Sequence, residues 1–197
     1  MNYSQLSILI PAAGASRRLG QTKQLVQYKS ITLIQNAVNI ASSINPREII
    51  VVTGYKASAV KNAVDQTSVH WVHNSNWSTG MGSSIAAGAA VVSHASCAVM
   101  ILLCDQWRLG SSDLSLMAET WQSNPERIIC ARANKQNMPP VIFPICFSGQ
   151  LQALEGENGA RNLLEDEPEL LTPVPLKNAL FDLDTAAGLN QLKSYDL

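Results

Sequence analysis

The segment SILIPAAGASRRLGQTKQ, residues 7–24, joins an apolar run to a loop of small and basic residues. Residues 7–12 are almost wholly apolar, which predicts a strand that is buried on both faces, as in a parallel sheet. The loop that follows carries three cationic side chains, those of Arg17, Arg18 and Lys23. A strand that ends in such a loop is typical of α/β domains, whose ligands bind at the carboxyl ends of the strands.

The rest of the chain alternates in the same way between apolar runs and helical patterns. Strands are expected at residues 48–53, 69–73, 97–104, 127–131 and 141–143, and helices at residues 31–43, 57–64, 83–92, 113–122, 147–154 and 160–165. Residues 170–176 contain two prolines, so an edge strand or an extended connection is expected there. This order predicts a three-layer α/β domain with a mainly parallel central sheet. We interpret residues 1–197 as a single domain.

The composition excludes several classes of protein. Hydrophobic residues make up 46% of the 197 residues, enough for a core, and the net charge is −1. A nucleic-acid-binding domain would carry a basic excess, and a disordered chain would be less apolar, so neither class fits. No apolar run is long enough to cross a bilayer, so no membrane partner is expected either. The four cysteines form no C-x-x-C pair, which favours a cytoplasmic protein with reduced thiols.

The loop after the first strand has two possible roles. Small residues allow backbone N–H groups to approach a phosphate, and the neighbouring cations would neutralise its charge. The alternative is a tight turn with a solvated pair of arginines. The loop is not a Walker A motif, because Gln21 stands where that motif has lysine, and it lacks the G-x-G-x-x-G of dinucleotide folds. Lys23 adds a third cation close by, which favours phosphate binding.

Two carboxylates are candidates for binding a cation beside that phosphate. Asp105 follows the most apolar run of the chain, where it either caps a helix or stands at the carboxyl end of a central strand. Mg²⁺ between phosphates needs only one or two protein carboxylates, since it keeps water and substrate oxygens as its other ligands. Asp105 and Asp184 could supply them, and Asp182 is a weaker candidate. No Ser-His-Asp or Cys-His arrangement points to a protein nucleophile.

The loop also resembles a known signature. Ala12-Ala13-Gly14-x-x-x-Arg18-Leu19-Gly20-x-x-Lys23-Gln24 is similar to the L-A-A-G-x-x-x-R-M-G-x-x-K pattern of nucleotidyltransferases. Further motifs follow in family order: Thr53-Gly54, Asn74-x-x-Trp77-x-x-Gly80-Met81-x-x-Ser84, Leu102-Leu103-Cys104-Asp105-Gln106, Pro140-Val141-x-Phe143-Pro144, Gly156-x-x-Gly159-Ala160-Arg161-x-Leu163-Leu164 and Asp182-x-Asp184-Thr185. Together they resemble the molybdenum cofactor nucleotidyltransferases, especially the cytidylyltransferase branch.

The resemblance implies a Rossmann-like nucleotidyltransferase fold and a reaction. Members of this family transfer a nucleoside monophosphate from CTP or GTP to the terminal phosphate of molybdopterin, with Mg²⁺, and release pyrophosphate. The attacking group would be the substrate's own phosphate, which is largely dianionic at neutral pH because its second pKa is about 6. The protein would then act by alignment and charge neutralisation rather than by proton abstraction.

The resemblance also assigns roles to residues of this chain. Arg18, Lys23 and Asp105 would be catalytic, with Arg18 and Lys23 neutralising the leaving pyrophosphate, while Asp105 and Asp184 would bind the metal. The expected nucleotide-binding residues are Ala12, Ala13, Gly14, Thr53, Gly54, Asn74, Gly80, Met81 and Ser84. Of these, Asn74, Gly80, Met81 and Ser84 would recognise the base and ribose, although a cap and turn is the structural alternative. Arg161 would bind the phosphate of the pterin acceptor, or be a solvated helix residue.

Departures from the family pattern lie mainly on the acceptor side. Trp107 replaces the usual proline after Asp-Gln, Met138 replaces a glycine, Glu157 replaces an aspartate, and residues 186–188 replace Pro-Glu-Asp. These departures bear on the acceptor rather than on the nucleotide loop or Asp105. From the resemblance we predict a CTP:molybdopterin cytidylyltransferase that works with a molybdoenzyme or its chaperone. The alternatives are a GTP-using guanylyltransferase and a non-catalytic accessory protein that binds the cofactor.

Overall fold

The structure of the chain is a computed structural model that describes residues 3–65, 68–184 and 186–194. The strands are β1 (Tyr3–Pro11), β2 (Gln27–Tyr28), β3 (Ile31–Thr32), β4 (Pro46–Thr53), β5 (Val69–His73), β6 (Ala98–Ile101), β7 (Ile128–Ala133), β8 (Gln136–Pro144) and β9 (Leu171–Pro175). The α-helices are α1 (Leu33–Ser43), α2 (Ala57–Asn62), α3 (Met81–Ala89), α4 (Ser111–Ser123), α5 (Ser148–Gln152), α6 (Arg161–Asp166) and α7 (Ala186–Ser194). Short 3₁₀ turns include η1 (Arg17–Leu19), η2 (Lys23–Leu25) and η6 (Lys177–Leu180).

The main sheet of the described chain has seven strands in the order β5-β4-β1-β6-β8-β7-β9. β1 pairs in parallel with β4 on one side and β6 on the other, and β4 pairs in parallel with β5. β8 runs antiparallel to both β6 and β7, whereas β7 and β9 are parallel. The predicted α/β fold with a mainly parallel sheet is therefore confirmed, with β8 as the antiparallel member.

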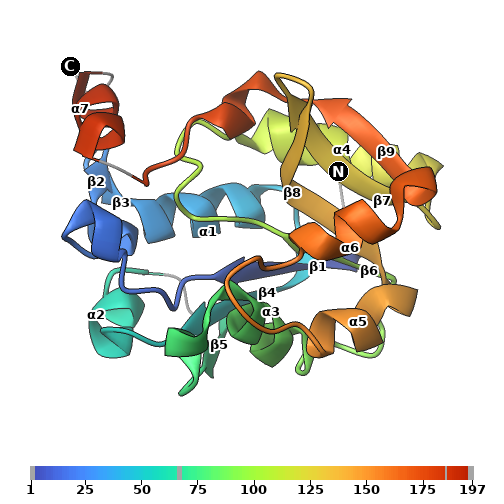
Figure 1. Cartoon of the computed structure of the whole chain (residues 1–197), viewed down its shortest axis with the longest axis horizontal. Helices are drawn as coiled ribbons and strands as arrows, with labels where there is room; N and C mark the ends of the chain where they lie inside the picture. The colour runs from blue at the N-terminus through green and yellow to red at the C-terminus, as the bar shows by residue number, and fades with distance from the viewer. Residues whose placement is uncertain (1–2, 66–67, 185, 195–197) are drawn as a thin grey trace.

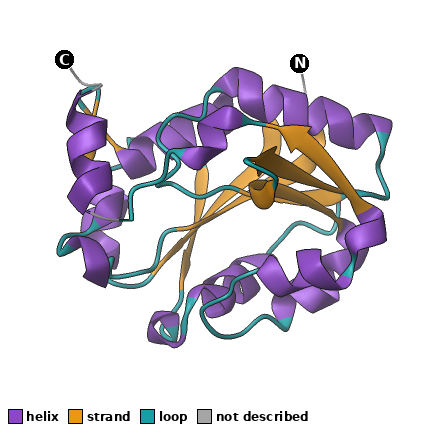
Figure 2. Cartoon of the chain, turned by 45° about the horizontal axis from the view of Figure 1, so that its top comes forward, coloured by secondary structure: helices purple, strands orange, loops and turns teal. Residues whose placement is uncertain are grey.

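Helices cover both faces of this sheet and make three layers (Figure 1). α1 and α4 lie against one face, and α3, α5 and α6 lie against the other, as the rotated view also shows (Figure 2). Alternate residues of β1 reach opposite cores, because successive side chains of a strand point to opposite faces. Ile8 and Ile10 pack with α1 and α4, whereas Leu9 packs with α3. This double burial explains why the strand is apolar at nearly every position.

Several predicted elements begin or end at different residues. The helix expected at residues 31–43 begins at Leu33, because Ile31 and Thr32 pair with β2 and the Thr32 hydroxyl then accepts from the Gln35 N–H at 3.2 Å. The helix expected at residues 113–122 begins earlier, after Gly110. Asp113 reaches back from the third helical position, and its carboxylate accepts from the Gly110 N–H at 2.9 Å.

The strand expected at residues 97–104 is also shorter. β6 ends at Ile101, and one further bond runs from the Leu102 N–H to the Leu9 carbonyl before the chain leaves the sheet. Residues 103–105 thus rise beyond the carboxyl ends of β1 and β6. The edge strand expected at residues 170–176 is confirmed as β9, paired on one side with β7. None of the helices in the described ranges has both the length and the apolar character needed to span a bilayer.

Candidate active site

A pocket of about 520 Å³ opens at the carboxyl ends of β1 and β6. One wall is the loop of residues 13–19 together with Lys23 and Gln24. The opposite wall comes from Trp77, Ser78 and the start of α3, and the floor includes Cys104, Asp105 and Asp184. The pocket lies where ligands bind in open α/β sheets, at the carboxyl ends of strands. Its cationic wall faces a carboxylate floor.

Gln24 holds the loop that follows β1. Its side-chain Nε2 donates to the carbonyl of Ala12 at 3.1 Å and to that of Gly14 at 3.0 Å. The hydroxyl of Ser16 accepts from the Lys23 N–H at 3.2 Å, so the turn η2 is fastened to the loop at two points. Gln24 is buried and adjoins Lys23, and it was not singled out from the sequence as a site residue. Its position in the motif beside Lys23 was the available signal.

Gly14 lies at the open side of the loop. A Cβ at this position would meet no atom within 4 Å, and the residue is exposed to the pocket. Nothing within the described protein therefore requires a glycine here. A ligand that approaches the backbone closely would require one, because a Cβ would occupy the space that the ligand needs.

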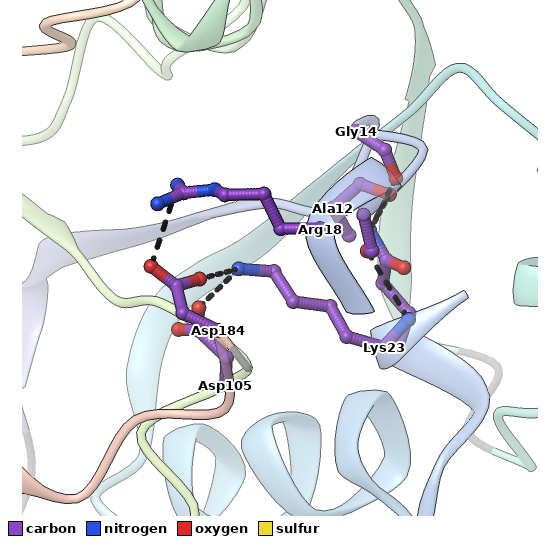
Figure 3. A network of polar contacts seen from close by, with 8 residues as sticks. Ala12, Gly14, Arg18, Lys23, Asp105 and Asp184 are labelled. Atoms are coloured by element: carbon purple, nitrogen blue, oxygen red, sulfur yellow. Dashed lines mark hydrogen bonds and ion pairs between the residues drawn. The ribbon is translucent and has the colours of Figure 1, made fainter. Parts of the chain in front are cut away.

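Lys23 connects three segments that are distant in the sequence (Figure 3). Its ammonium contacts Oδ2 of Asp105 and lies 3.1 Å from Oδ1 of Asp184. Arg18 lies above it, with its guanidinium 3.5 Å from the other oxygen of Asp184. Asp105 is placed by the chain leaving β6, and its carbonyl accepts from the Leu183 N–H at 3.1 Å. That bond holds the Asp184 segment against Asp105.

Burial by itself would lower the pKa of Lys23, but the neighbouring Asp105, with smaller contributions from Cys104 and Asp184, holds the pKa above its ordinary value. The ammonium is therefore charged throughout the neutral range. Burial, reinforced by Asp105, raises the pKa of the Cys104 thiol to about 12. Cys104 is thus a buried, protonated thiol at neutral pH.

The carboxylates fit a hard divalent cation. Oδ1 of Asp105 is buried and has no hydrogen-bond partner in the described parts of the chain. Asp184 is linked to the same Lys23 ammonium, so the two carboxylates lie on either side of one position. Two carboxylates suffice for Mg²⁺ or Mn²⁺ when phosphate and water complete the shell. Residues 3–65, 68–184 and 186–194 contain no cluster of three or more His, Cys, Asp or Glu that could hold a metal on protein ligands alone.

The opposite wall is held by a polar turn. Asn74 is buried, and its side-chain amide donates to the hydroxyls of Ser83 at 2.9 Å and Ser84 at 3.1 Å. Its carbonyl oxygen accepts from the Asn76 N–H at 2.9 Å. Behind this turn, a Cβ at Gly54 would stand 2.6 Å from the Trp77 side chain, so the glycine lets the indole pack closely. Asn74 and Gly54 thus support residues that line the pocket.

Gly80 fixes a contact between two distant loops. Its φ of 124° is accessible to glycine alone, and a Cβ would overlap the backbone of Gly156. The adjacent Gly82 N–H donates to the Gly156 carbonyl at 2.8 Å. Glu157, which follows, lines the pocket. In the sequence, Glu157 is marked only by its departure from the aspartate of the family pattern.

A second pocket of about 500 Å³ adjoins the first, and Leu103 lines both. Its polar lining comes from Gln106, Gln136, Asn137, Arg161, Glu165 and Asp182. Asp182 faces this pocket rather than the first, and partial burial together with Asp105 and Asp184 raises its pKa. Residues 156–161 therefore connect the two pockets, with Glu157 in the first and Arg161 in the second.

The residues predicted from the sequence fall into three groups. The first pocket is lined by Ala13, Gly14, Arg18, Lys23, Gly80, Met81, Ser84, Asp105 and Asp184. Ala12, Thr53, Gly54 and Asn74 lie behind its wall, where the Thr53 hydroxyl donates to the Val72 carbonyl at 3.2 Å. Arg161 lies in the second pocket. Thr185 of the last motif lies outside the described residues.

The chain is similar to a known domain and to several known proteins. The MobA-like NTP transferase domain matches residues 8–171. Nicotine blue oxidoreductase of Paenarthrobacter nicotinovorans is 30% identical over 192 residues, which are 92% of this chain and 93% of that protein. Molybdenum cofactor cytidylyltransferase of Escherichia coli is 28% identical over 95 residues, 48% of this chain and 49% of that protein.

Solved structures have the same fold. Rv0371C of Mycobacterium tuberculosis in complex with manganese has a TM-score of 0.80 and 21% identity, covering 95% of this chain and 97% of that one. The domain match extends over most of the chain, from β1 to the start of β9, and includes the loop, Lys23 and Asp105. The chain therefore belongs to the nucleotidyltransferase family described by the MobA-like NTP transferase domain.

Proposed function

We propose that this protein transfers CMP from CTP to the terminal phosphate of a molybdopterin-type acceptor and releases pyrophosphate, with Mg²⁺ as its cofactor. The observation that carries the proposal is the contact of Lys23 with Asp105 and Asp184 on the floor of a pocket walled by the β1 loop. Cations and carboxylates at one strand end suit a polyphosphate that arrives with a divalent metal.

The residues divide the work by position. Residues 13–16 line the pocket, and their backbone N–H groups are suited to hold phosphate oxygens. Lys23 and Arg18 line the same pocket and would neutralise the charge that accumulates on the leaving pyrophosphate. Met81 and Ser84 on the opposite wall contact the nucleoside. The acceptor phosphate, which is its own nucleophile, enters from the second pocket, where Arg161 binds it.

Asp105 and Asp184 would hold the metal ion, which when bound would supply Lewis-acid chemistry to the phosphates. Oδ1 of Asp105, which has no hydrogen-bond partner among the described residues, supports this assignment. The manganese complex of the similarly folded Rv0371C also supports a divalent ion. The choice of CTP over GTP follows the cytidylyltransferase resemblance, and a guanylyltransferase is the alternative within the same reaction.

The direct test is release of pyrophosphate from each of CTP, GTP, ATP and UTP, with Mg²⁺ and purified molybdopterin. We expect release with CTP only when the acceptor is present. A thermal-shift panel with the same nucleotides reports binding separately, because a ligand of the native state raises the melting temperature. Binding of CTP without any turnover would favour a non-catalytic accessory protein and contradict the transferase.

A second function is favoured by one comparison. The similarity to nicotine blue oxidoreductase covers 92% of the chain, about twice the share covered by the cytidylyltransferase match. If the protein reduced a dye of this kind, it would need an electron donor. A nicotinamide dinucleotide could be that donor, because a phosphate-binding loop also suits its pyrophosphate. The test is oxidation of NADH or NADPH in the presence of nicotine blue. Oxidation that depends on the dye, with no pyrophosphate release from any triphosphate, would replace the transferase by the oxidoreductase.

A further inference from the structure

Lys23 contacts both carboxylates of the candidate metal site at once. Its ammonium meets Oδ2 of Asp105 and lies 3.1 Å from Asp184. The side chains of Lys23 and Asp105 are 20% and 7% exposed, so this contact is largely shielded from water. In the proposed reaction these three side chains have different partners. The two carboxylates bind the metal, and the lysine binds phosphate. The inference below rests on that proposed function.

The charges of the network explain why a metal cannot bind the two carboxylates while Lys23 is paired with them. Arg18 and Lys23 carry two positive charges, and Asp105 and Asp184 carry two negative charges, so the four contacting side chains are balanced. A divalent cation added alone would lie beside the Lys23 ammonium. In a partly buried site that repulsion is screened far less than in water, so it opposes metal binding strongly.

A triphosphate removes this obstacle. Its oxygens are acceptors for Lys23 and Arg18, and the lysine has a flexible four-carbon stem that lets the ammonium move to them. The Arg18 side chain is 80% exposed, so the protein leaves it room to turn toward the phosphates. Once the ammonium has left, Asp105 and Asp184 are available to the cation, and the phosphates add further oxygen ligands to it.

We infer that Lys23 is a built-in counter-ion that keeps the divalent-metal site closed until a nucleoside triphosphate binds. Metal and nucleotide are then bound in a coupled manner, each raising the affinity for the other, because such coupling is reciprocal. The site consequently does not retain a metal between turnovers.

The test uses Mn²⁺ as the probe and the full chain. Its EPR signal, which is strong in water and lost on binding, is titrated with wild type, with Lys23→Met and with the matched control Lys61→Met. Lys61 is exposed in α2 and lies outside both pockets. We expect Lys23→Met to bind Mn²⁺ about tenfold tighter than wild type or the control. Adding Asp105→Asn to Lys23→Met should abolish the gain, which assigns the bound ion to this site.

The role of the nucleotide is measured on the wild type alone, so it does not depend on the folding of a variant. CTP is added to the Mn²⁺ titration, and a protein-free blank of Mn²⁺ with CTP is subtracted. We expect CTP to tighten Mn²⁺ binding by wild type about tenfold or more, and to tighten binding by Lys23→Met much less. GTP, ATP and UTP are tested in parallel, because the inference requires a triphosphate and not a particular base.

Two results would overturn the inference: equal Mn²⁺ affinity of wild type and Lys23→Met, or wild-type affinity that none of the four triphosphates changes. These results are separate from failure of the proposed transfer, because the titration contains no acceptor and requires no turnover. A protein that shows the coupling but releases no pyrophosphate keeps the closed metal site and contradicts only the transferase.

Discussion

At the scale of single residues, the candidate site depends on carboxylates that lie beyond the carboxyl ends of the strands, where they line the pocket. Asp105 follows the buried β6. The chain leaves the sheet after Leu102, and the Asp105 carboxylate then contacts Lys23. The sequence places an aspartate after an apolar run, which predicts its location at a strand end. The sequence does not predict that Lys23 is the partner of Asp105, because the two residues are 82 positions apart and the turn η2 brings them together.

We predict that Asp105→Asn lowers the rate of pyrophosphate release about a hundredfold, the effect typical of losing one preorganised charge contact. The substitution keeps the size of the side chain but removes the anionic oxygens that the metal needs. Steady-state rates at saturating Mg²⁺ are compared with those of Asp65→Asn, an exposed carboxyl outside both pockets. A normal rate for Asp105→Asn would remove it from the metal site.

Gln24 allows a different prediction, since it is a positioning residue. Gln24→Leu removes two hydrogen bonds to the loop carbonyls of Ala12 and Gly14, so the loop loses its fixed shape. We expect the KM for CTP to rise while kcat changes less, and the free energy of unfolding to fall by about 1–3 kcal/mol. Urea unfolding and initial rates measure the two effects. If stability falls while the KM stays normal, the bonds hold the fold but not the binding loop.

At the scale of elements, the two glycine-containing turns differ in what they demand. Gly14 is open to the pocket, whereas Gly80 has a backbone conformation that only glycine adopts and touches Gly156. We predict that Gly80→Ala lowers the free energy of unfolding by about 2 kcal/mol or more. Gly14→Ala should change it by less than about 0.5 kcal/mol but weaken CTP binding. Thermal melts with and without CTP separate the two, and a Gly14→Ala protein that binds CTP normally would contradict a close approach of phosphate there.

Element boundaries show what local sequence can and cannot decide. The apolar runs of β1, β4 and β6 are predictable because strands buried on both faces are apolar nearly throughout. The start of α1 is not, because Thr32 both ends the short β3 and caps the helix through its hydroxyl. The start of α4 depends on Asp113 reaching back to Gly110. Such caps are identified from the geometry, since any of several neighbouring Ser and Asp residues could serve.

At the scale of the whole molecule, the sequence indicates which residues are candidates for the site, but it does not show how they are grouped. Lys23, Asp105 and Asp184 were all candidates, yet their convergence depends on the order of β1, β4 and β6 in the sheet and on the Leu183 hydrogen bond. Thr53 and Asn74 are expected beside the nucleotide but lie behind the wall, where the Thr53 hydroxyl donates to a carbonyl of strand β5 and the Asn74 amide donates to serine hydroxyls of α3. A motif identifies both kinds of residue, and only the packing separates them.

The two adjoining pockets give the prediction that tests the molecule as a whole. Arg161 lines the second pocket and does not line the first, although residues 156–161 touch both. If the acceptor enters there, Arg161→Ala should raise the KM for the acceptor about tenfold or more, since charge-assisted hydrogen bonds to its phosphate are lost. The KM for CTP should change less than about twofold, because a substitution in one pocket has little effect on a separate pocket. Arg161→Lys should restore only part of the loss, because an ammonium cannot reproduce the paired donors of a guanidinium.

A kinetic matrix in which the concentrations of CTP and acceptor are varied independently measures both KM values. An effect confined to CTP would mean that Arg161 reaches the first pocket during turnover, and unchanged constants for both substrates would assign Arg161 to solvent and leave the second pocket without its phosphate ligand.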